Sequence, residues 1–249
     1  MATPASEPAW PPPPSSLLAA PHAVQDKAKR VHKMFAAIAP FYDLNNRLHS
    51  LWMDQHWRSV AVQMAEVQPT DTIVDVACGT GDLTLKFARK NSRVMGIDFT
   101  DEMLAIARKK VPNASFVQGD ALALPLSDAS ADIVSIAFGI RNVADWGKAI
   151  NEFTRILRPG GRLIILEFSL PTNPMIRWLY DFYFRKMMPV TATFISRDRS
   201  GAYKYLPESV HTFISCQAMQ ERMRQAGFTG VTSRPLTCGI CVCHKGVKQ

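Results

Sequence analysis

Short apolar runs alternate with amphipathic patterns of helical period from Thr72 onwards, and this alternation constrains the fold more than any other feature. Such alternation is typical of a parallel sheet with helices on both faces. Ligands of such sheets lie beyond the carboxyl ends of the strands, so the residues after each strand are the first candidates for a site. We expect strands at 72–77, 93–98, 115–119, 132–138 and 162–168, and helices at 82–90, 101–110 and 145–157.

The first 24 residues have a different composition from the rest. Seven of the 17 prolines fall within the first 21 residues, a stretch without Lys or Arg. It buries too little apolar surface to offset the entropy of ordering, so we expect a disordered tail over 1–24 and a single folded domain over 25–249. Near the start of that domain, apolar residues at 31, 34, 35 and 38 predict a short amphipathic helix that ends before Pro40.

Charge and cysteine content limit the environment and the partners. The chain has 29 Lys and Arg against 21 Asp and Glu, a net charge of +8, which permits both nucleic acid and anionic membranes. No window holds the roughly 18 apolar residues of a bilayer-spanning helix, and the N-terminus lacks a secretory signal. Five cysteines form no even disulfide framework, so we expect a cytoplasmic protein.

A glycine-rich loop follows the first strand, in the run Asp75-Val-Ala-Cys-Gly79-Thr80-Gly81-Asp82. Glycines permit a tight turn where the backbone approaches a ligand. A dinucleotide-binding fingerprint would need Gly or Ala at position 84, where this chain has Thr. Asp82 would also repel a phosphate at the start of the next helix, so we expect a ligand that lacks phosphates or is cationic.

Acidic residues also end the next two strands, at Asp98 and Asp120. Asp98 stands 23 residues after Asp75, close to the spacing at which a carboxylate reaches ribose hydroxyls. This set of acids favours a nucleoside with positive charge, such as S-adenosylmethionine. The alternative is that Asp75, Asp82 and Asp98 serve only as turn formers and helix caps.

Four runs carry a resemblance to a known family. They are Met34-Phe-Ala-Ala-Ile-Ala-Pro-Phe-Tyr-Asp-Leu-Asn-Asn46, the glycine loop continued by Leu-Thr, Phe138-Gly-Ile-Arg-Asn-Val-Ala-Asp145, and Arg155-Ile-Leu-Arg-Pro-Gly-Gly-Arg-Leu-Ile-Ile-Leu-Glu-Phe-Ser169. From about Val31 to its end, the chain resembles the ubiquinone/menaquinone biosynthesis C-methyltransferase family. The resemblance implies an α/β fold: the Rossmann-like, doubly wound, mostly parallel seven-stranded sheet of class I methyltransferases, with N-terminal helices and a helical insertion after the fifth strand.

The resemblance further implies S-adenosylmethionine as the cofactor, S-adenosylhomocysteine as its product, and no metal. The family's cofactor contacts, carried over by position, are Thr80, Asp98 and the pair Asp120–Ala121. Ala137 stands where the family commonly has a serine, which removes one side-chain hydrogen bond to the cofactor or replaces it with a bond from the backbone. The full set of candidate cofactor-binding residues is Gly79, Thr80, Gly81, Asp98, Phe99, Asp120 and Ala121.

The implied reaction transfers a methyl group to a ring carbon of a polyprenylated hydroquinone, either demethylmenaquinol or 2-polyprenyl-6-methoxy-1,4-benzoquinol. Arg141 and Asn142 are the candidate catalytic residues. Arginine, with a pKa of about 12 or more, is a poor base, so we expect Arg141 to stabilise the phenolate and Asn142 to orient a hydroxyl or a water. Alternatively, Arg141 pairs with Asp145 one helical turn later. Tyr203 and Tyr205 are the candidate quinol-binding residues.

The insertion, at about 170–212, contains an unusually apolar helix, predicted from Met175 to Met188. It suits a prenyl chain or a bilayer face, with a dimer interface or a core-packing helix as the alternative. The expected partners are therefore a lipid-soluble quinol and the inner face of a membrane, with a homodimer as a further option.

Two other functions remain as alternatives. A methyltransferase of RNA or of another small molecule is compatible with the charge, but no basic tract interleaved with aromatic residues favours nucleic acid. A non-catalytic cofactor-binding scaffold in a biosynthetic complex would account for Ala137. The cysteines at 238, 241 and 243 lack zinc-site spacing and are expected to belong to a strand.

Overall fold

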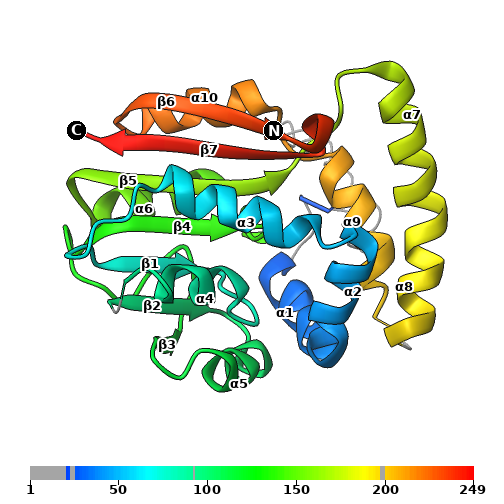
Figure 1. Ribbon diagram of the computed structural model, residues 1–249, viewed down its shortest axis with the longest axis horizontal. Helices are drawn as coiled ribbons and strands as arrows, with labels where there is room; N and C mark the ends of the chain where they lie inside the picture. The colour runs from blue at the N-terminus through cyan, green and yellow to red at the C-terminus, as the bar shows by residue number, and fades with distance from the viewer. Residues whose placement is uncertain (1–20, 23–25, 92, 197–199) are drawn as a thin grey trace, which may run out of the picture.

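The computed structural model describes residues 21–22, 26–91, 93–196 and 200–249. Apart from residues 21–22, the predicted tail lies outside the described residues. The centre of the protein is a seven-stranded sheet of order β3-β2-β1-β4-β5-β7-β6 (Figure 1). Strands β1 to β5 pair in parallel, and β7 runs antiparallel to both β5 and β6. The strands are β1 Ile73–Val76, β2 Val94–Asp98, β3 Ser115–Gln118, β4 Ala131–Ala137, β5 Leu157–Phe168, β6 Phe228–Leu236 and β7 Cys241–Lys248.

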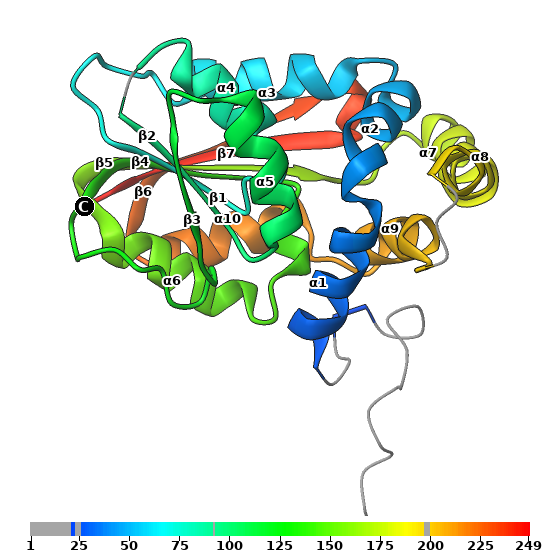
Figure 2. The same cartoon turned by 90° about the horizontal axis from the view of Figure 1, so that it is seen from below.

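Helices cover both faces of the sheet (Figure 2). One face packs against α3 (Met53–Met64) and α4 (Asp82–Ala88), and the other against α6 (Trp146–Ile156) and α10 (Cys216–Gln225). Successive strand side chains alternate between the faces, so Ile73 contributes to one core and Val74 to the other. Burial on both faces explains the near-continuous apolar runs of β1, β2 and β4. The helix α5 (Asp101–Lys110) connects β2 to β3.

A further group of helices covers the edge of the sheet where the parallel strands end (Figure 1). These helices share an apolar core that includes Met34, Tyr180 and Tyr203. The segments of this group are α1 Lys27–Ile38, η1 Ala39–Phe41, α2 Tyr42–Ser50, α7 Pro174–Phe182, the π-helical turn η3 Tyr183–Met187, α8 Met188–Ser196 and α9 Ala202–His211. The N-terminal helices and the insertion therefore enclose the expected ligand edge.

The predicted fold class is confirmed, and most predicted element limits agree with the structure within two residues. Two segments differ. Strand β5 begins at Leu157, which pairs with Ala131, so residues 158–161 form an irregularity inside the strand and do not precede it. The predicted helix Met175–Met188 is part of a longer helical segment over 174–196, which contains the π turn.

Candidate active site

A cavity of about 150 Å³ lies at the ends of β1, β2 and β4, beside α1. Five of the predicted cofactor-binding residues line it, and so does Asn142 from the short helix η2 (Ile140–Asn142). These five are Gly79, Asp98, Phe99, Asp120 and Ala121. Thr80 and Gly81 belong to the same glycine loop but are not part of this wall. Most of the predicted cofactor set therefore meets in one cavity.

The carboxylate of Asp98, the last residue of β2, is fixed by backbone amides at the edge of this cavity. Its Oδ2 accepts a hydrogen bond from the Gly79 amide at 2.7 Å, and its Oδ1 accepts one from the Thr100 amide at 2.9 Å. Burial raises the pKa of Asp98, and the two amide bonds oppose that rise. Each carboxylate oxygen has a second lone pair, so Asp98 retains capacity to accept ligand hydroxyls.

The backbone is strained at two strand ends that border the cavity. Ala77 and Phe138 have φ values of 50° and 58°, a region that residues with a β-carbon rarely adopt. Close approach makes Gly139 necessary, since a β-carbon there would lie 2.6 Å from the Cβ of Ala77. Backbone outliers of this kind cost about 1–3 kcal/mol each and cluster at functional sites.

Two of the acids singled out from the sequence do not face this cavity. Asp75 is buried within the sheet layer, where its carboxylate accepts hydrogen bonds from Thr84 at 2.6 Å and Ser135 at 2.8 Å. Asp82 is neutralised by cations: burial opposes its ionisation, but Arg58, Lys110 and Arg47 together lower the pKa of Asp82 to about 2. The charge of Asp82 is therefore compensated within the protein, so the expectation of a ligand that lacks phosphates or is cationic rests on the other residues of the site.

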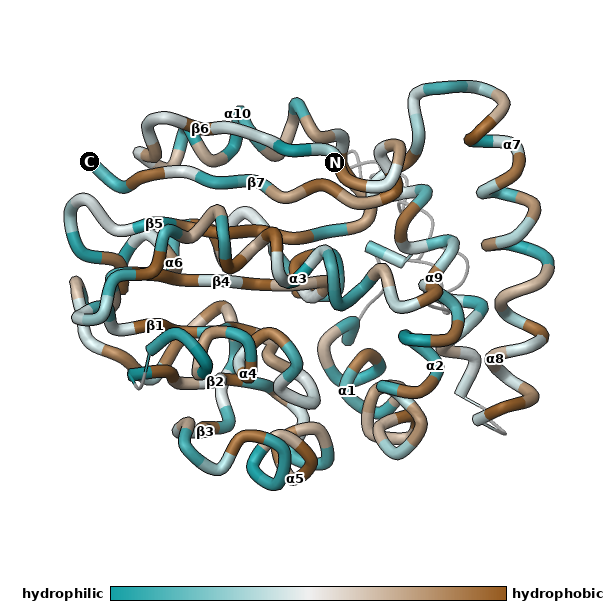
Figure 3. The backbone as a smooth tube through the Cα atoms, in the orientation of Figure 1, coloured by the Kyte–Doolittle hydropathy of each residue, from teal (hydrophilic) through white to brown (hydrophobic). Residues whose placement is uncertain are grey.

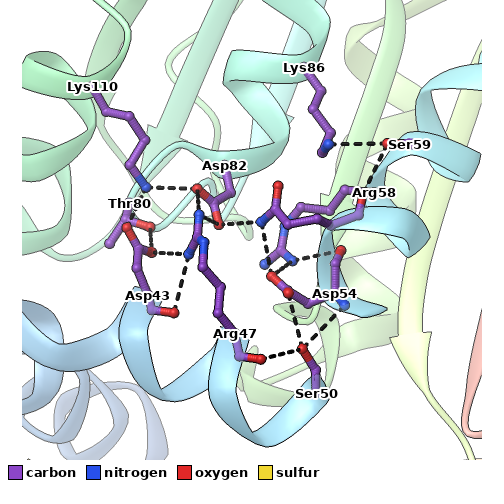
Figure 4. Close-up of polar contacts among 11 residues, drawn as sticks. Asp43, Arg47, Ser50, Asp54, Arg58, Ser59, Thr80, Asp82, Lys86 and Lys110 are labelled. Carbon is purple, nitrogen blue, oxygen red and sulfur yellow. Dashed lines mark hydrogen bonds and ion pairs between the residues drawn. The ribbon is translucent and has the colours of Figure 1, made fainter. Parts of the chain in front are cut away.

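Polar contacts with α2 and α5 also hold the glycine loop in place (Figure 4). Thr80 Oγ1 donates a hydrogen bond to Asp43 Oδ1 at 2.6 Å, and Lys110 Nζ lies 2.5 Å from Asp43 Oδ2. Arg47 Nη2 lies 3.0 Å from Asp82 Oδ1, which Lys110 also contacts at 2.7 Å. These contacts orient Thr80 toward α2, so its predicted cofactor contact remains a prediction.

A second cavity, of about 60 Å³, adjoins the first. Phe35, Tyr42 and Phe138 line both cavities and form a shared wall. The candidate quinol-binding residues Tyr203 and Tyr205, both from α9, line the second cavity together with Arg141. The predicted site residues thus divide between two neighbouring spaces.

Arg141 is buried and paired, but its partner is not the one considered from the sequence. Its Nη1 donates to Glu167 Oε1 at 2.6 Å and to the carbonyl of Phe138 at 2.7 Å, and its Nε donates to Ser209 Oγ at 3.3 Å. Asp145, the expected alternative partner, caps α6 by accepting a hydrogen bond from the Lys148 amide at 2.9 Å. The alternative ion pair with Asp145 is therefore wrong.

Hydrogen bonds link Asn142 to residues of both cavities. Asn142 Oδ1 accepts a bond from the Tyr205 hydroxyl at 3.0 Å, while Asn142 Nδ2 donates to the Phe138 carbonyl at 3.3 Å. The buried Lys27 holds the same segment, because its Nζ donates to the carbonyls of Arg141 at 2.8 Å and Val143 at 2.7 Å. Burial, with a further effect of Arg141, lowers the pKa of Lys27 to about 8.

Sequence reasoning missed Glu167 and Lys27 as parts of the site. A signal existed for Glu167, an acid near the end of an otherwise apolar buried strand, where a carboxylate requires a charged or hydrogen-bonding partner. Lys27 gave no comparable signal, because its partners are backbone carbonyls far along the chain.

Two of the three C-terminal cysteines lie in a strand as predicted, but the prediction was wrong for Cys238, which lies in a turn before that strand. Cys241 and Cys243 are buried in β7, and Cys238 is exposed in the turn η4 (Thr237–Gly239). Burial raises the pKa of Cys243 to about 12. Among the described residues, no group of three or more His, Cys, Asp or Glu side chains is arranged to hold a metal ion.

Comparison with known proteins agrees with this geometry. A demethylmenaquinone methyltransferase from Thermus thermophilus is 44% identical over 219 residues, which cover 86% of this chain and 99% of the relative. A ubiquinone/menaquinone biosynthesis C-methyltransferase from a Geobacter species is 41% identical over 236 residues, or 91% of this chain and all of the relative. The fold is similar to that of a solved S-adenosylmethionine-dependent methyltransferase from Thermotoga maritima, with a TM-score of 0.59 at 22% identity over 87% of this chain and 100% of that one.

The model of the ubiE/COQ5 methyltransferase family matches residues 23–248, nearly the whole folded part of the chain. The family model, the relatives and the order of the strands all point to the same family. The chain therefore belongs to the ubiE/COQ5 methyltransferase family.

Proposed function

We propose that this methyltransferase moves a methyl group from S-adenosylmethionine to a ring carbon of a prenylated hydroquinone. The observation that carries the proposal is the pair of adjoining cavities, in which Asn142 lines the first and Arg141 lines the second. Two ligands in these spaces would lie next to each other beside the shared lining residues Phe35, Tyr42 and Phe138, and transfer requires that their reacting atoms be in direct contact. The quinone-pathway names of the relatives support the choice of acceptor.

The first cavity fits S-adenosylmethionine. Asp98 offers lone pairs for the ribose hydroxyls, and Asp120 adds a second carboxylate. The apolar side chains of Phe99, Met103 and Leu122 suit an adenine ring. A β-carbon at Gly79 would meet no protein atom within 4 Å, so the loop leaves open space there for a ligand. When bound, this cofactor supplies an electrophilic methyl group on a sulfonium centre.

Arg141 is the residue that we assign to the developing phenolate. Its Nη1 and Nε are engaged, and among the described residues none accepts a hydrogen bond from Nη2, which is the donor left for a ring oxygen. A guanidinium remains charged at neutral pH, and a charge-assisted hydrogen bond is stronger in a site that excludes water. Loss of the ring hydroxyl proton to a water leaves the phenolate, which carries more electron density on the neighbouring ring carbon than the neutral phenol does. That carbon is the nucleophile, and after it has gained the methyl group it releases its own proton to water, which restores the aromatic ring.

Tyr205 orients Asn142 in this scheme and does not act as a base. Burial raises the pKa of Tyr205 to about 12, so its hydroxyl stays protonated and donates to Asn142 Oδ1 at neutral pH. That bond fixes the amide, so that Asn142 Nδ2 is directed to the Phe138 carbonyl.

The direct test is methyl transfer by the purified protein. We expect label from methyl-labelled S-adenosylmethionine in the lipid extract after incubation with short-chain demethylmenaquinol or with 2-polyprenyl-6-methoxy-1,4-benzoquinol, and none in RNA. Arg141→Ala should abolish turnover, whereas the control Arg108→Ala, on the exposed side of α5, should retain it. Labelled RNA, or cofactor binding without transfer to either quinol, would contradict the proposal.

A further inference from the structure

An exposed apolar stripe runs along one side of the α7–η3–α8 segment, which stands at the end of the molecule (Figure 1). Its members are between 47% and 85% exposed, and the hydropathy colouring shows hydrophobic stretches along both helices (Figure 3). A contiguous apolar row of this kind marks an interaction surface, because solvation of so much apolar area is unfavourable. The apolar stripe consists of Met175, Trp178, Leu179, Phe182, Met187, Val190 and Phe194.

The π turn explains how one segment keeps an exposed and a buried face over its whole length. Four of the buried residues are spaced four positions apart, and in an uninterrupted α-helix this spacing would turn their face by about 120° over three steps. A π turn contains one residue more than an α-helical turn, and this extra residue cancels about 100° of that rotation. It also accommodates the spacing of five between Phe182 and Met187 in the apolar stripe. The four residues at this spacing are Tyr180, Phe184, Met188 and Ala192; Pro189 and Ser196 are buried as well.

Basic side chains border the apolar stripe along a groove between this segment and α9. Among the described residues, no carboxylate lies within ion-pair distance of Lys186 or Lys204, which both line the groove. Arg185, also in the groove, pairs with Glu208 at 2.7 Å. With Asp181 also in its lining, the groove holds three cationic and two acidic side chains. The groove therefore has a small net positive charge beside apolar rings, a combination that matches the headgroups and acyl chains of anionic lipids.

A second exposed apolar element lies against the same segment. Leu51 and Trp52, in the turn between α2 and α3, are 80% and 56% exposed, and both adopt positive φ. The end of α2 contacts η3 and α8, since the Tyr183 hydroxyl donates to the His49 carbonyl at 3.1 Å and His49 Nε2 lies 2.8 Å from Thr191 Oγ1. Figure 2 shows this turn on the same side of the molecule as α7 and α8.

We propose that the apolar stripe, with Lys186 and Lys204, docks this protein on bilayers that contain anionic lipid. In the described part of the chain no helix is long and apolar enough to cross a bilayer, so the segment would lie in the plane of the interface. Its buried face leads toward the second cavity, because Phe184 packs 6.0 Å from the ring of Phe168, which lines that cavity. The docking itself is independent of the proposed reaction, since it requires neither ligand.

The test is binding of the full chain to vesicles, measured by flotation, with phosphatidylcholine alone or mixed with phosphatidylglycerol. We expect binding to rise strongly with phosphatidylglycerol. Lys186→Gln together with Lys204→Gln should weaken it about 25-fold, or about fivefold per charge. The control pair is Lys90→Gln and Lys109→Gln. Both lysines are exposed, Lys90 in the turn after α4 and Lys109 on α5, so this pair should change binding little.

Loss of the apolar contact is tested separately. Trp178→Ser with Phe182→Ser, which removes two stacked exposed rings, should reduce binding to both kinds of vesicle while the circular dichroism spectrum and Tm stay unchanged. Equal vesicle binding by this variant and the parent chain would overturn the proposal. The proposal would also be overturned if the parent chain bound no vesicles but formed a dimer that these substitutions dissociate. The apolar stripe would then be an interface between two copies of this chain.

Discussion

The buried pair of Arg141 and Glu167 should be the most sensitive point of the candidate site. The two residues are 4% and 3% exposed, and Arg141 Nη1 lies 2.6 Å from Glu167 Oε1. Burial raises the pKa of Glu167 even though Arg141 opposes the rise, so desolvation of the carboxylate outweighs the attraction of its partner. A pair of this kind contributes little net stability, but breaking it leaves one buried charge uncompensated.

The magnitude of the effect differs between the two partners. Glu167→Gln leaves a guanidinium that cannot lose its proton, and should lower the free energy of unfolding by about 3–5 kcal/mol. Arg141→Met should lower it less, because Glu167 can take up a proton when it has no partner. The double variant Arg141→Met/Glu167→Gln should recover most of the loss, since no unpaired charge is then buried.

Urea denaturation at pH 7 of the four chains measures these free energies in a double-mutant cycle. Cofactor affinity should change less than about twofold in Glu167→Gln, because neither partner lines the first cavity. A loss below about 1 kcal/mol for Glu167→Gln, or additive effects in the double variant, would refute the view that this pair is a buried, coupled unit.

Three further variants test other contacts. Asp98→Asn should weaken S-adenosylmethionine binding by calorimetry about 10- to 100-fold, as expected for lost charge-assisted hydrogen bonds, whereas Asp101→Asn, exposed at the start of α5, should not. Tyr205→Phe, which deletes the bond to Asn142, should lower kcat several-fold and leave cofactor affinity unchanged. Burial raises the pKa of Asp75 to about 6, so between about pH 4 and 6 the native state binds more protons than the unfolded state. Stability relative to Asp75→Asn should thus fall by about 3 kcal/mol from pH 4 to 7 in urea titrations; a constant difference would contradict that pKa.

The central strands β1, β2 and β4 could be predicted from the sequence because they are buried on both faces, whereas the helices that cover them are buried on one. That difference in burial gives strands continuous apolar runs and gives helices apolar residues at a period of about 3.6. The limits predicted from these patterns for β2 and α5 agree with the structure to within one residue. The π turn was not predicted, although the spacing of five between Phe182 and Met187 departs from one α-helical face and is a signal for it.

Side-chain directions and long-range partners limited the prediction of the site. Asp75 lies within β1 and not at its end, so its carboxylate points into a packed layer, whereas Asp98 ends β2 and reaches the cavity. The pairing of Arg141 with Asp145 assumed an α-helix, but residues 140–142 form a short 3₁₀ turn and α6 begins only at Trp146. Glu167 became the partner instead, 26 positions along the chain.

Phe138 links the strain in the backbone to the division of the site. Its positive φ is an unfavourable conformation, and its carbonyl accepts hydrogen bonds from both Arg141 Nη1 and Asn142 Nδ2. These bonds help to hold the strained residue, which lines both cavities. The side chains of Arg141 and Asn142 both bind the carbonyl of Phe138. This shared contact fixes the distance between the Arg141 donor that remains for the second cavity and the Asn142 amide at the first. Transfer between two ligands needs such a fixed geometry, and a mobile wall would lose it.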